Sequence, residues 1–220
     1  MQRKLGYPVA AGEPYHRADA ALTDLSGQNP FAIKLIELLD MISYRKLTKS
    51  ELPGIADIDR SEIIRVGYEV KYGKLIRKDV VWDTPDFILE GEGAHTISEQ
   101  VAFCRDHLER NGISIGAFDH DRLVGIGVLT PNLRPGMAQL AYLYVSAPYR
   151  RMGIATELAC QLIRHARKQG ANRVYVSATP SESAVDFYRS IGFDLIDEPL
   201  PELFELEPED IHMVLELGVG

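Results

Sequence analysis

The sequence predicts an α/β fold, because strand patterns and amphipathic helix patterns follow one another along the second half of the chain. An aromatic and β-branched run ends at Pro148, which cannot donate to a strand ladder, and a 3.6-residue apolar period then occupies 154–166. A second strand pattern at 173–178 precedes a helix within 181–193. Each of these two segments is therefore predicted to form a strand, a turn and a helix.

Length and composition fit one ordinary domain, or one domain with an extension. The chain has 220 residues, of which 45% are hydrophobic and 25% charged, so a full core is available and global disorder is excluded. The formal net charge of -8 argues against a general nucleic-acid binder. Cys104 and Cys160 are predicted to be buried thiols, and no ligand spacing predicts a metal site.

No run approaches the roughly 18 apolar residues of a membrane span. The N-terminus also lacks the apolar core of a signal peptide. We therefore expect a cytoplasmic protein that does not use a membrane.

The first 40 residues are predicted to be an N-terminal extension of a domain at 41–220. Residues 1–28 contain prolines and glycines without a sustained period, so we expect a partly disordered arm. Asn29-Pro30 then favours the start of a short helix that reaches Leu39.

The domain is predicted to open with a strand at 41–47 and a helix at 52–64. Two alternating runs on either side of Tyr72-Gly73 predict a β-hairpin at 66–82.

A capping box of Thr96 and Glu99 predicts a helix that ends before Gly112. The remaining strands are predicted at 113–118, 122–129, 140–145, 173–178, 193–196 and 211–217.

An anion site is predicted where the strand ending at Pro148 turns into the following helix. The first amides of a helix have no intrahelical acceptor, and the helix dipole places partial positive charge there. Gly153 leaves room for a bulky anion to approach the backbone, and Arg150 and Arg151 add positive charge suited to phosphate oxygens. A pyrophosphate matches this site; an ordinary exposed loop is the alternative.

With these motifs the chain resembles the GCN5-related N-acetyltransferase (GNAT) superfamily. Its members carry an R/Q-x-x-G-x-G/A turn after the fourth strand, which matches 150–155, and a later A-x-x-F-Y-x-x-x-G-F helix, which matches 184–193. The resemblance covers roughly residues 41 to 217. It implies a mixed, mostly antiparallel sheet of about seven strands flanked by helices, with the 66–82 hairpin as an addition before the second helix.

The resemblance also implies an acetyl-CoA-dependent N-acetyltransferase and a cofactor site. In the superfamily the strand before the turn splays from its neighbour, so the backbone of Leu143 and Val145 is expected to bind the pantetheine arm. Ser181 stands where many relatives carry Asn, which weakens the usual contact there. The expected cofactor-binding turn comprises Arg150, Arg151, Met152, Gly153, Ile154, Ala155 and Thr156.

Tyr188 occupies the place of the tyrosine that the superfamily commonly uses to protonate the departing thiolate. A phenol has a pKa near 10 and a thiol a pKa of about 8.5, so this tyrosine is neutral at physiological pH and can donate as charge develops. The alternative is a core aromatic residue beside Phe187.

The base that takes a proton from the amine is harder to assign, because the strand at 139–144 contains no carboxylate. Glu92 is the preferred candidate, followed by Glu69, Glu90 and His95, and each of these can also be an ordinary polar residue. We expect the hairpin and residues 87–95 to form a wall or lid over the substrate.

The acceptor is expected to be the primary amine of a small, cationic molecule. An acidic run at 197–210 is interleaved with Leu and Phe, and the superfamily often places this connection beside the acceptor. The alternative for this run is a solvated loop whose leucines cover the core or a dimer contact, since superfamily members are often homodimers. A catalytically silent acyl-CoA sensor and a protein or peptide N-acetyltransferase are the competing functions.

Overall fold

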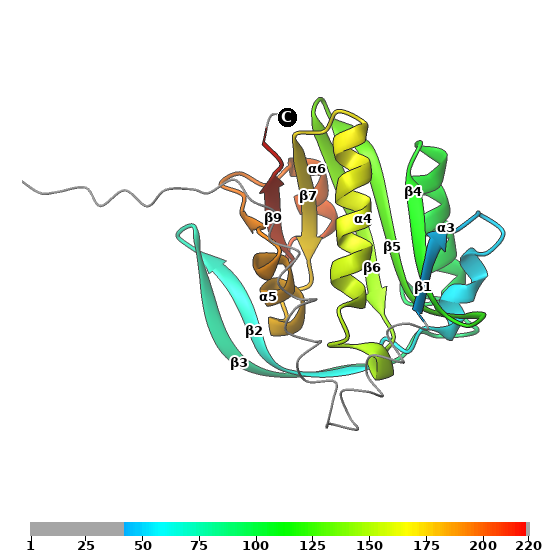
Figure 1. Ribbon diagram of the computed structural model, residues 1–220. Coiled ribbons are helices and arrows are strands. Elements are labelled where there is room, and N and C mark those ends of the chain that lie inside the picture. Colours follow the sequence, from blue (N-terminus) through cyan, green and yellow to red (C-terminus); the bar gives the residue numbers. More distant parts are fainter. Residues whose placement is uncertain (1–41, 219–220) are drawn as a thin grey trace, which may run out of the picture. The chain divides into compact units, whose positions relative to one another are not determined.

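The structure is a computed structural model that describes residues 42–218 (Figure 1). The predicted extension at 1–40, with its helix after Pro30, lies outside the described residues. The elements are β1 (Ile42–Lys46), η1 (Leu52–Asp57), β2 (Glu62–Lys71), β3 (Lys74–Thr84), α3 (Ile97–Glu109), β4 (Ile113–Asp119), β5 (Arg122–Arg134), β6 (Met137–Val145), η2 (Ala147–Tyr149), α4 (Ile154–Lys168), β7 (Arg173–Ala178), α5 (Glu182–Ser190), β8 (Asp194–Leu195), α6 (Pro201–Leu206) and β9 (Ile211–Glu216).

Seven strands form one mixed sheet in the order β1-β4-β5-β6-β7-β9-β8. Neighbouring strands run antiparallel, except that β6 and β7 are parallel. The predicted fold class is therefore confirmed, and each predicted strand within the described residues is present.

Helices cover both faces of this sheet (Figure 1). α4 and α5 pack on one face through Leu158, Leu162 and Val185, which are fully buried. η1 and α3 pack on the opposite face, where Ile55 and Cys104 are fully buried. The side of the sheet that α4 and α5 cover is the α4 face, and the side that η1 and α3 cover is the α3 face.

The predicted helix at 52–64 is wrong in its second half. Only Leu52–Asp57 is helical, as a 3-10 turn, and the chain is already extended at Ile58 and enters β2 at Glu62. Gly54 weakens a helix, while Ile63 and Ile64 are β-branched residues that favour a strand.

The acidic run predicted as a loop at 197–210 contains the short helix α6. Pro201 stands in its first turn, a position where a missing amide hydrogen costs nothing. Leu203 of this helix is buried against Met137 and Tyr175, so α6 covers the α3 face at the β6–β7 end of the core. The interleaved leucine thus packs on the core, as the alternative interpretation of the run expected.

The predicted hairpin is confirmed as β2 and β3, which form a separate two-stranded sheet. Tyr72 and Gly73 both have positive φ, 53° and 70°, as a tight hairpin turn requires. β2 lies against α5 (Figure 1): the Tyr68 amide donates to the Pro180 carbonyl (2.9 Å) and the Tyr68 hydroxyl donates to Asp186 (2.9 Å). The hairpin is therefore fixed beside the start of α5.

Candidate active site

The central feature of the sheet is the separation of β6 from β7. Their parallel pairing covers Met137 to Gln139 of β6 and ends at the pair Gln139 and Tyr175. Beyond that pair β6 continues to Val145 and β7 to Ala178 without a ladder between them. The sheet therefore opens into a wedge, and the edge of β6 that faces the wedge has free backbone groups.

A β-bulge in β6 decides which side chains line this wedge. The register against β5 shifts between the pairs Val128–Tyr142 and Leu129–Leu140, which leaves Ala141 as the extra residue. After the bulge Leu143 packs towards the α4 face, while Tyr142 and Tyr144 pack towards the α3 face. The bulge thus brings two tyrosines to one side of the wedge.

At the end of β6 the chain turns into α4 through two residues in the left-handed region. Arg151 has φ 66° and Gly153, the N-cap of α4, has φ 79°. An added Cβ at Gly153 would meet nothing within 4 Å, so crowding does not require a glycine here. The positive φ of the backbone does favour a glycine at this position. The amides of Ile154, Ala155 and Thr156 precede the first intrahelical donor, Glu157, and can bind an anion.

The Arg150 side chain is already bound by protein groups and is not free to bind a phosphate with its whole guanidinium. Its Nη2 donates to the Arg60 carbonyl (3.0 Å), its Nη1 to the Ser61 carbonyl (3.0 Å) and its Nε to the Val145 carbonyl (3.2 Å). Glu62 lies 3.6 Å from Nη1. The guanidinium holds the segment before β2 on the turn, whereas the side chain of Arg151 is exposed.

Ser181 is 2% exposed and is the N-cap of α5, where its hydroxyl accepts from the Ala184 amide (3.2 Å). Gly67 of β2 pairs with Ser181 as an isolated bridge. The start of α5 is therefore covered by β2, and the predicted contact between Ser181 and the cofactor stays a prediction.

Tyr188 lies in α5 and is 7% exposed. Its ring packs between Phe187 and Phe193, with centroid distances of 5.1 and 5.4 Å. Burial, followed by the neighbouring groups Tyr144 and Asp210, raises the pKa of Tyr188 well above its usual value. Its hydroxyl has no hydrogen-bond partner among residues 42–218, and its role as proton donor to the departing sulfur stays a prediction.

The sequence did not single out Asp210, a half-buried carboxyl in the turn between α6 and β9. Burial and the charge of Glu207 raise the pKa of Asp210 to about 7. Its charge in turn raises the pKa of both Tyr144 and Tyr188, after the larger effect of their burial. Asp210 therefore lies within electrostatic reach of the tyrosines on both sides of the wedge.

A signal for Asp210 was present in the sequence. It directly precedes the last predicted strand, and β9 pairs Ile211 with Ala178 at the end of β7. An acidic residue at that register has to lie beside the open part of the sheet. Among many acidic neighbours it looked like one member of a solvated run.

The four carboxylate and histidine candidates lie outside this group. Glu90 and Glu92 are exposed in the loop between β3 and α3. Glu69 is paired with Lys71 (2.6 Å) and Lys78 (3.4 Å), and the hydrogen bond from Lys71 lowers its pKa. Burial and the Arg60 charge lower the pKa of His95.

The loop between β3 and α3 nevertheless borders the wedge. The Phe87 ring meets the Tyr144 ring edge-on at 5.5 Å, and Tyr142 donates to Gln100 of α3 (2.9 Å). This contact supports the predicted wall beside the substrate. The role of Glu92 as base stays a prediction.

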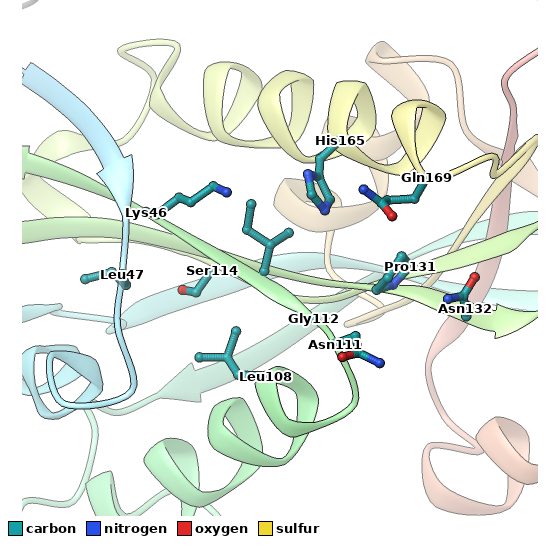
Figure 2. A pocket seen from close by; sticks show the side chains of 11 residues that line it. Lys46, Leu47, Leu108, Asn111, Gly112, Ser114, Pro131, Asn132, His165 and Gln169 are labelled. Atoms are coloured by element: carbon teal, nitrogen blue, oxygen red, sulfur yellow. The ribbon is translucent and has the colours of Figure 1, made fainter.

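A separate cavity of about 530 Å³ lies near the sheet edge formed by β1 and β4 (Figure 2). His165 of α4 and Gln169, the C-cap of that helix, line it from one side of β4, and Leu108 of α3 lines it from the other. None of the residues that form the wedge lines this cavity, so it is distinct from the candidate active site.

Among the described residues, no cluster of His, Cys, Asp and Glu could hold a metal ion. No helix in residues 42–218 is long and apolar enough to span a membrane.

The wedge between the parallel strands and the open N-terminus of α4 agree with the cofactor site that the resemblance to the GNAT superfamily implies. Residues 79–193 match the sequence profile of the Acetyltransferase (GNAT) family, and the chain belongs to this family. It is an N-acetyltransferase that uses acetyl-CoA.

Two relatives and one solved structure illustrate the similarity. N-alpha-acetyltransferase 50 of Danio rerio is 29% identical over 54% of this chain and 73% of that protein. N-acetyltransferase 8 of Homo sapiens is 36% identical over 39% of this chain and 40% of that protein. A Bacillus anthracis structure, named as a streptothricin acetyltransferase in complex with acetyl coenzyme A, aligns with TM-score 0.60 and 19% identity over 80% of this chain and 99% of that chain. At that identity the structure supports the fold alone.

Proposed function

We propose that the protein acetylates the primary amine of a small acceptor that enters the wedge from the α3 face. The observation that carries this proposal is Asp210, a half-buried carboxyl with a pKa of about 7 that is electrostatically coupled to Tyr144 and Tyr188. A group with this pKa is partly ionised at neutral pH and can accept a proton from an ammonium ion. Glu207 adds negative charge close to Asp210, and such charge attracts cations.

The chemistry assigned to these residues balances. Asp210 takes one proton from the bound ammonium group, and the neutral nitrogen forms a bond to the thioester carbon. The carbon–sulfur bond then breaks, and Tyr188 donates a hydrogen bond or proton to the departing sulfur. The amide loses its second nitrogen proton to solvent or to the tyrosinate, and the acetylated amine leaves. Asp210 fits the role of base better than Glu92, because Glu92 is exposed to water on a loop.

The cofactor would be held by the chain's own turn and strand. The free amides at Ile154, Ala155 and Thr156 suit a pyrophosphate, and the open edge of β6 near Leu143 suits the amide groups of pantetheine. Arg151 supplies an exposed positive charge, while Arg150 fixes the turn through its three carbonyl contacts.

A peptide N-terminus is the second candidate acceptor, because the relative that is 29% identical carries the name N-alpha-acetyltransferase 50. A panel of polyamines, aminoglycosides, amino acids and short peptides, followed by release of the CoA thiol, separates the two. Turnover of small amines supports the proposal. Turnover of peptides alone would replace it with the second candidate, and CoA binding without any turnover would favour a silent sensor.

A further inference from the structure

Arg60 is the most buried cation among residues 42–218, with 7% of its surface exposed. Its Nε donates to the Pro85 carbonyl (2.9 Å), and its Nη1 lies 2.9 Å from His95 Nδ1. The guanidinium also lies over the Phe87 ring, 5.2 Å from the centroid. The carbonyl and the Phe87 ring carry no charge, and burial together with the Arg60 charge lowers the pKa of His95, which favours its neutral form.

Arg60 forms no ion pair with any described residue. Exposed arginines of the same chain do pair, such as Arg77 with Glu182 (3.2 Å) and Arg164 with Glu157 (3.2 Å). A buried charge without a counterion is costly, so proteins normally pair it. The Nη2 corner of Arg60 has no partner within residues 42–218 and is available for an anion.

The position of Arg60 connects this unpaired charge with the candidate active site. Arg60 stacks on Phe87, and Phe87 contacts Tyr144 at 5.5 Å. Burial dominates the raised pKa of Tyr144, with Arg60 opposing the rise and Asp210 adding to it. Tyr144 therefore lies within reach of a positive group, Arg60, and a negative group, Asp210.

We infer that the acceptor is a zwitterionic small molecule, a primary amine that carries a carboxylate nearby, with its carboxylate bound by Arg60 and its ammonium by Asp210. This inference rests on the proposed function. A guanidinium binds a carboxylate with charge-assisted hydrogen bonds, and Phe87 and Tyr144 offer an apolar wall for the part between the charges. A free amino acid or an amino-acid conjugate with a free carboxylate meets these requirements, whereas a polyamine does not.

The first test uses the full-length wild-type protein and matched acceptors. Each of several amino acids is compared with its amide, which lacks the negative charge, and with the corresponding decarboxylated amine. We expect kcat/KM, measured by thiol release, to be at least about tenfold higher for the carboxylate form. Equal or faster turnover of the amides and amines overturns the inference. If polyamines are then acetylated, the proposed function survives; if no amine or peptide is acetylated, the proposed function itself fails.

The second test changes the guanidinium. Arg60→Gln should raise the KM of a carboxylate acceptor at least about tenfold and leave the KM of acetyl-CoA unchanged, and Arg60→Lys should recover part of the loss. Arg65→Gln, at an exposed position of β2, is the control for the loss of one charge. An equal loss of acetyl-CoA affinity would assign Arg60 to the cofactor and contradict the inference. If thermal melting shows that Arg60→Gln is unfolded, Arg60→Lys and the wild-type acceptor comparison decide.

Discussion

The guanidinium of Arg150 donates to the carbonyl oxygen of Arg60, with 3.0 Å between Nη2 and the oxygen. This contact ties the turn at the start of α4 to the segment that leads into β2. β2 then reaches the Pro180 carbonyl at the start of α5 through the Tyr68 amide. The chain from Arg60 to Tyr68 therefore links both motifs that resemble the superfamily, across the open ends of β6 and β7.

Arg150→Ala should destabilise the fold as well as weaken acetyl-CoA binding. Three carbonyls lose a charged donor, so we expect a loss of about 2 kcal/mol in unfolding free energy and a weakening of acetyl-CoA binding by about tenfold. Thermal melting and calorimetry measure the two effects. Arg151→Ala, at an exposed position, should leave the melting temperature unchanged. A normal melting temperature for Arg150→Ala combined with weaker binding would instead make Arg150 a direct ligand.

Tyr188→Phe should reduce kcat by about 100-fold without changing the fold, because general acid catalysis contributes at about this level. The Tyr188 hydroxyl has no hydrogen-bond partner among the described residues, so its removal breaks no structural contact. We expect the affinity for acetyl-CoA and the melting temperature to stay close to wild type. Tyr44→Phe, on β1 at the far edge of the sheet, is the matched control. Unchanged kcat for Tyr188→Phe would leave Tyr188 as a core aromatic residue.

The order of strands and helices could be predicted from the sequence because most elements carry their own local signals. Thr96 is the N-cap of α3 as predicted and accepts from the Glu99 amide, although the Thr96 amide donates to the Gly93 carbonyl and not to the Glu99 side chain, so the reciprocal half of the capping box does not form. Ser181 caps α5. The helix predicted at 52–64 failed because its last residues, which include the β-branched Ile63 and Ile64, pair with β3. A local sequence pattern therefore predicts an element correctly where capping and residue propensity decide it, and fails where pairing with a distant strand decides it.

The candidate site could be predicted only in part, because its important contacts join distant residues. Arg150 was identified as a cation on a turn, but two of its three carbonyl partners lie 89 and 90 residues earlier in the chain. The altered pKa of Asp210 depends on its burial in the folded chain and on Glu207, and neither follows from residue type. The unpaired state of Arg60 likewise requires knowledge of every neighbour.

His107 should make the fold sensitive to acid. It is buried, its Nδ1 lies 2.7 Å from the Thr130 hydroxyl, and burial together with the Arg110 charge lowers its pKa to about 4. The unfolded chain, with a histidine pKa near 6.5, binds a proton that the folded chain rejects, so stability falls as pH drops from about 6.5 to about 4.

The size of this effect of His107 is at most about 3 kcal/mol, since one pKa unit corresponds to about 1.4 kcal/mol. Chemical denaturation at several pH values should show a flatter profile for His107→Gln than for wild type in this window. Identical slopes for His107→Gln and wild type would contradict the assignment.

Asp210 should control both the rate and the stability as pH changes. As the proposed base it must be ionised, so kcat/KM should rise with pH up to about 7 and then level off. Asp210→Asn should lose this rise and lower the rate by about 100-fold or more, whereas Glu209→Gln, at an exposed neighbouring position, should retain the wild-type profile.

The stability effect of Asp210 has the opposite sign to that of a paired carboxylate. Its folded pKa of about 7 lies above the usual value of 3.8, so the folded state holds a proton that the unfolded chain releases, and stability falls as pH rises between these values. Asp210→Asn should therefore be more stable than wild type at pH 8, on the order of a few kcal/mol, and similar to wild type at pH 4. Higher stability at pH 8 with a retained pH–rate profile would show a buried acid that is not the base. An unchanged stability at pH 8 would show that the carboxyl is not buried as the wedge geometry requires.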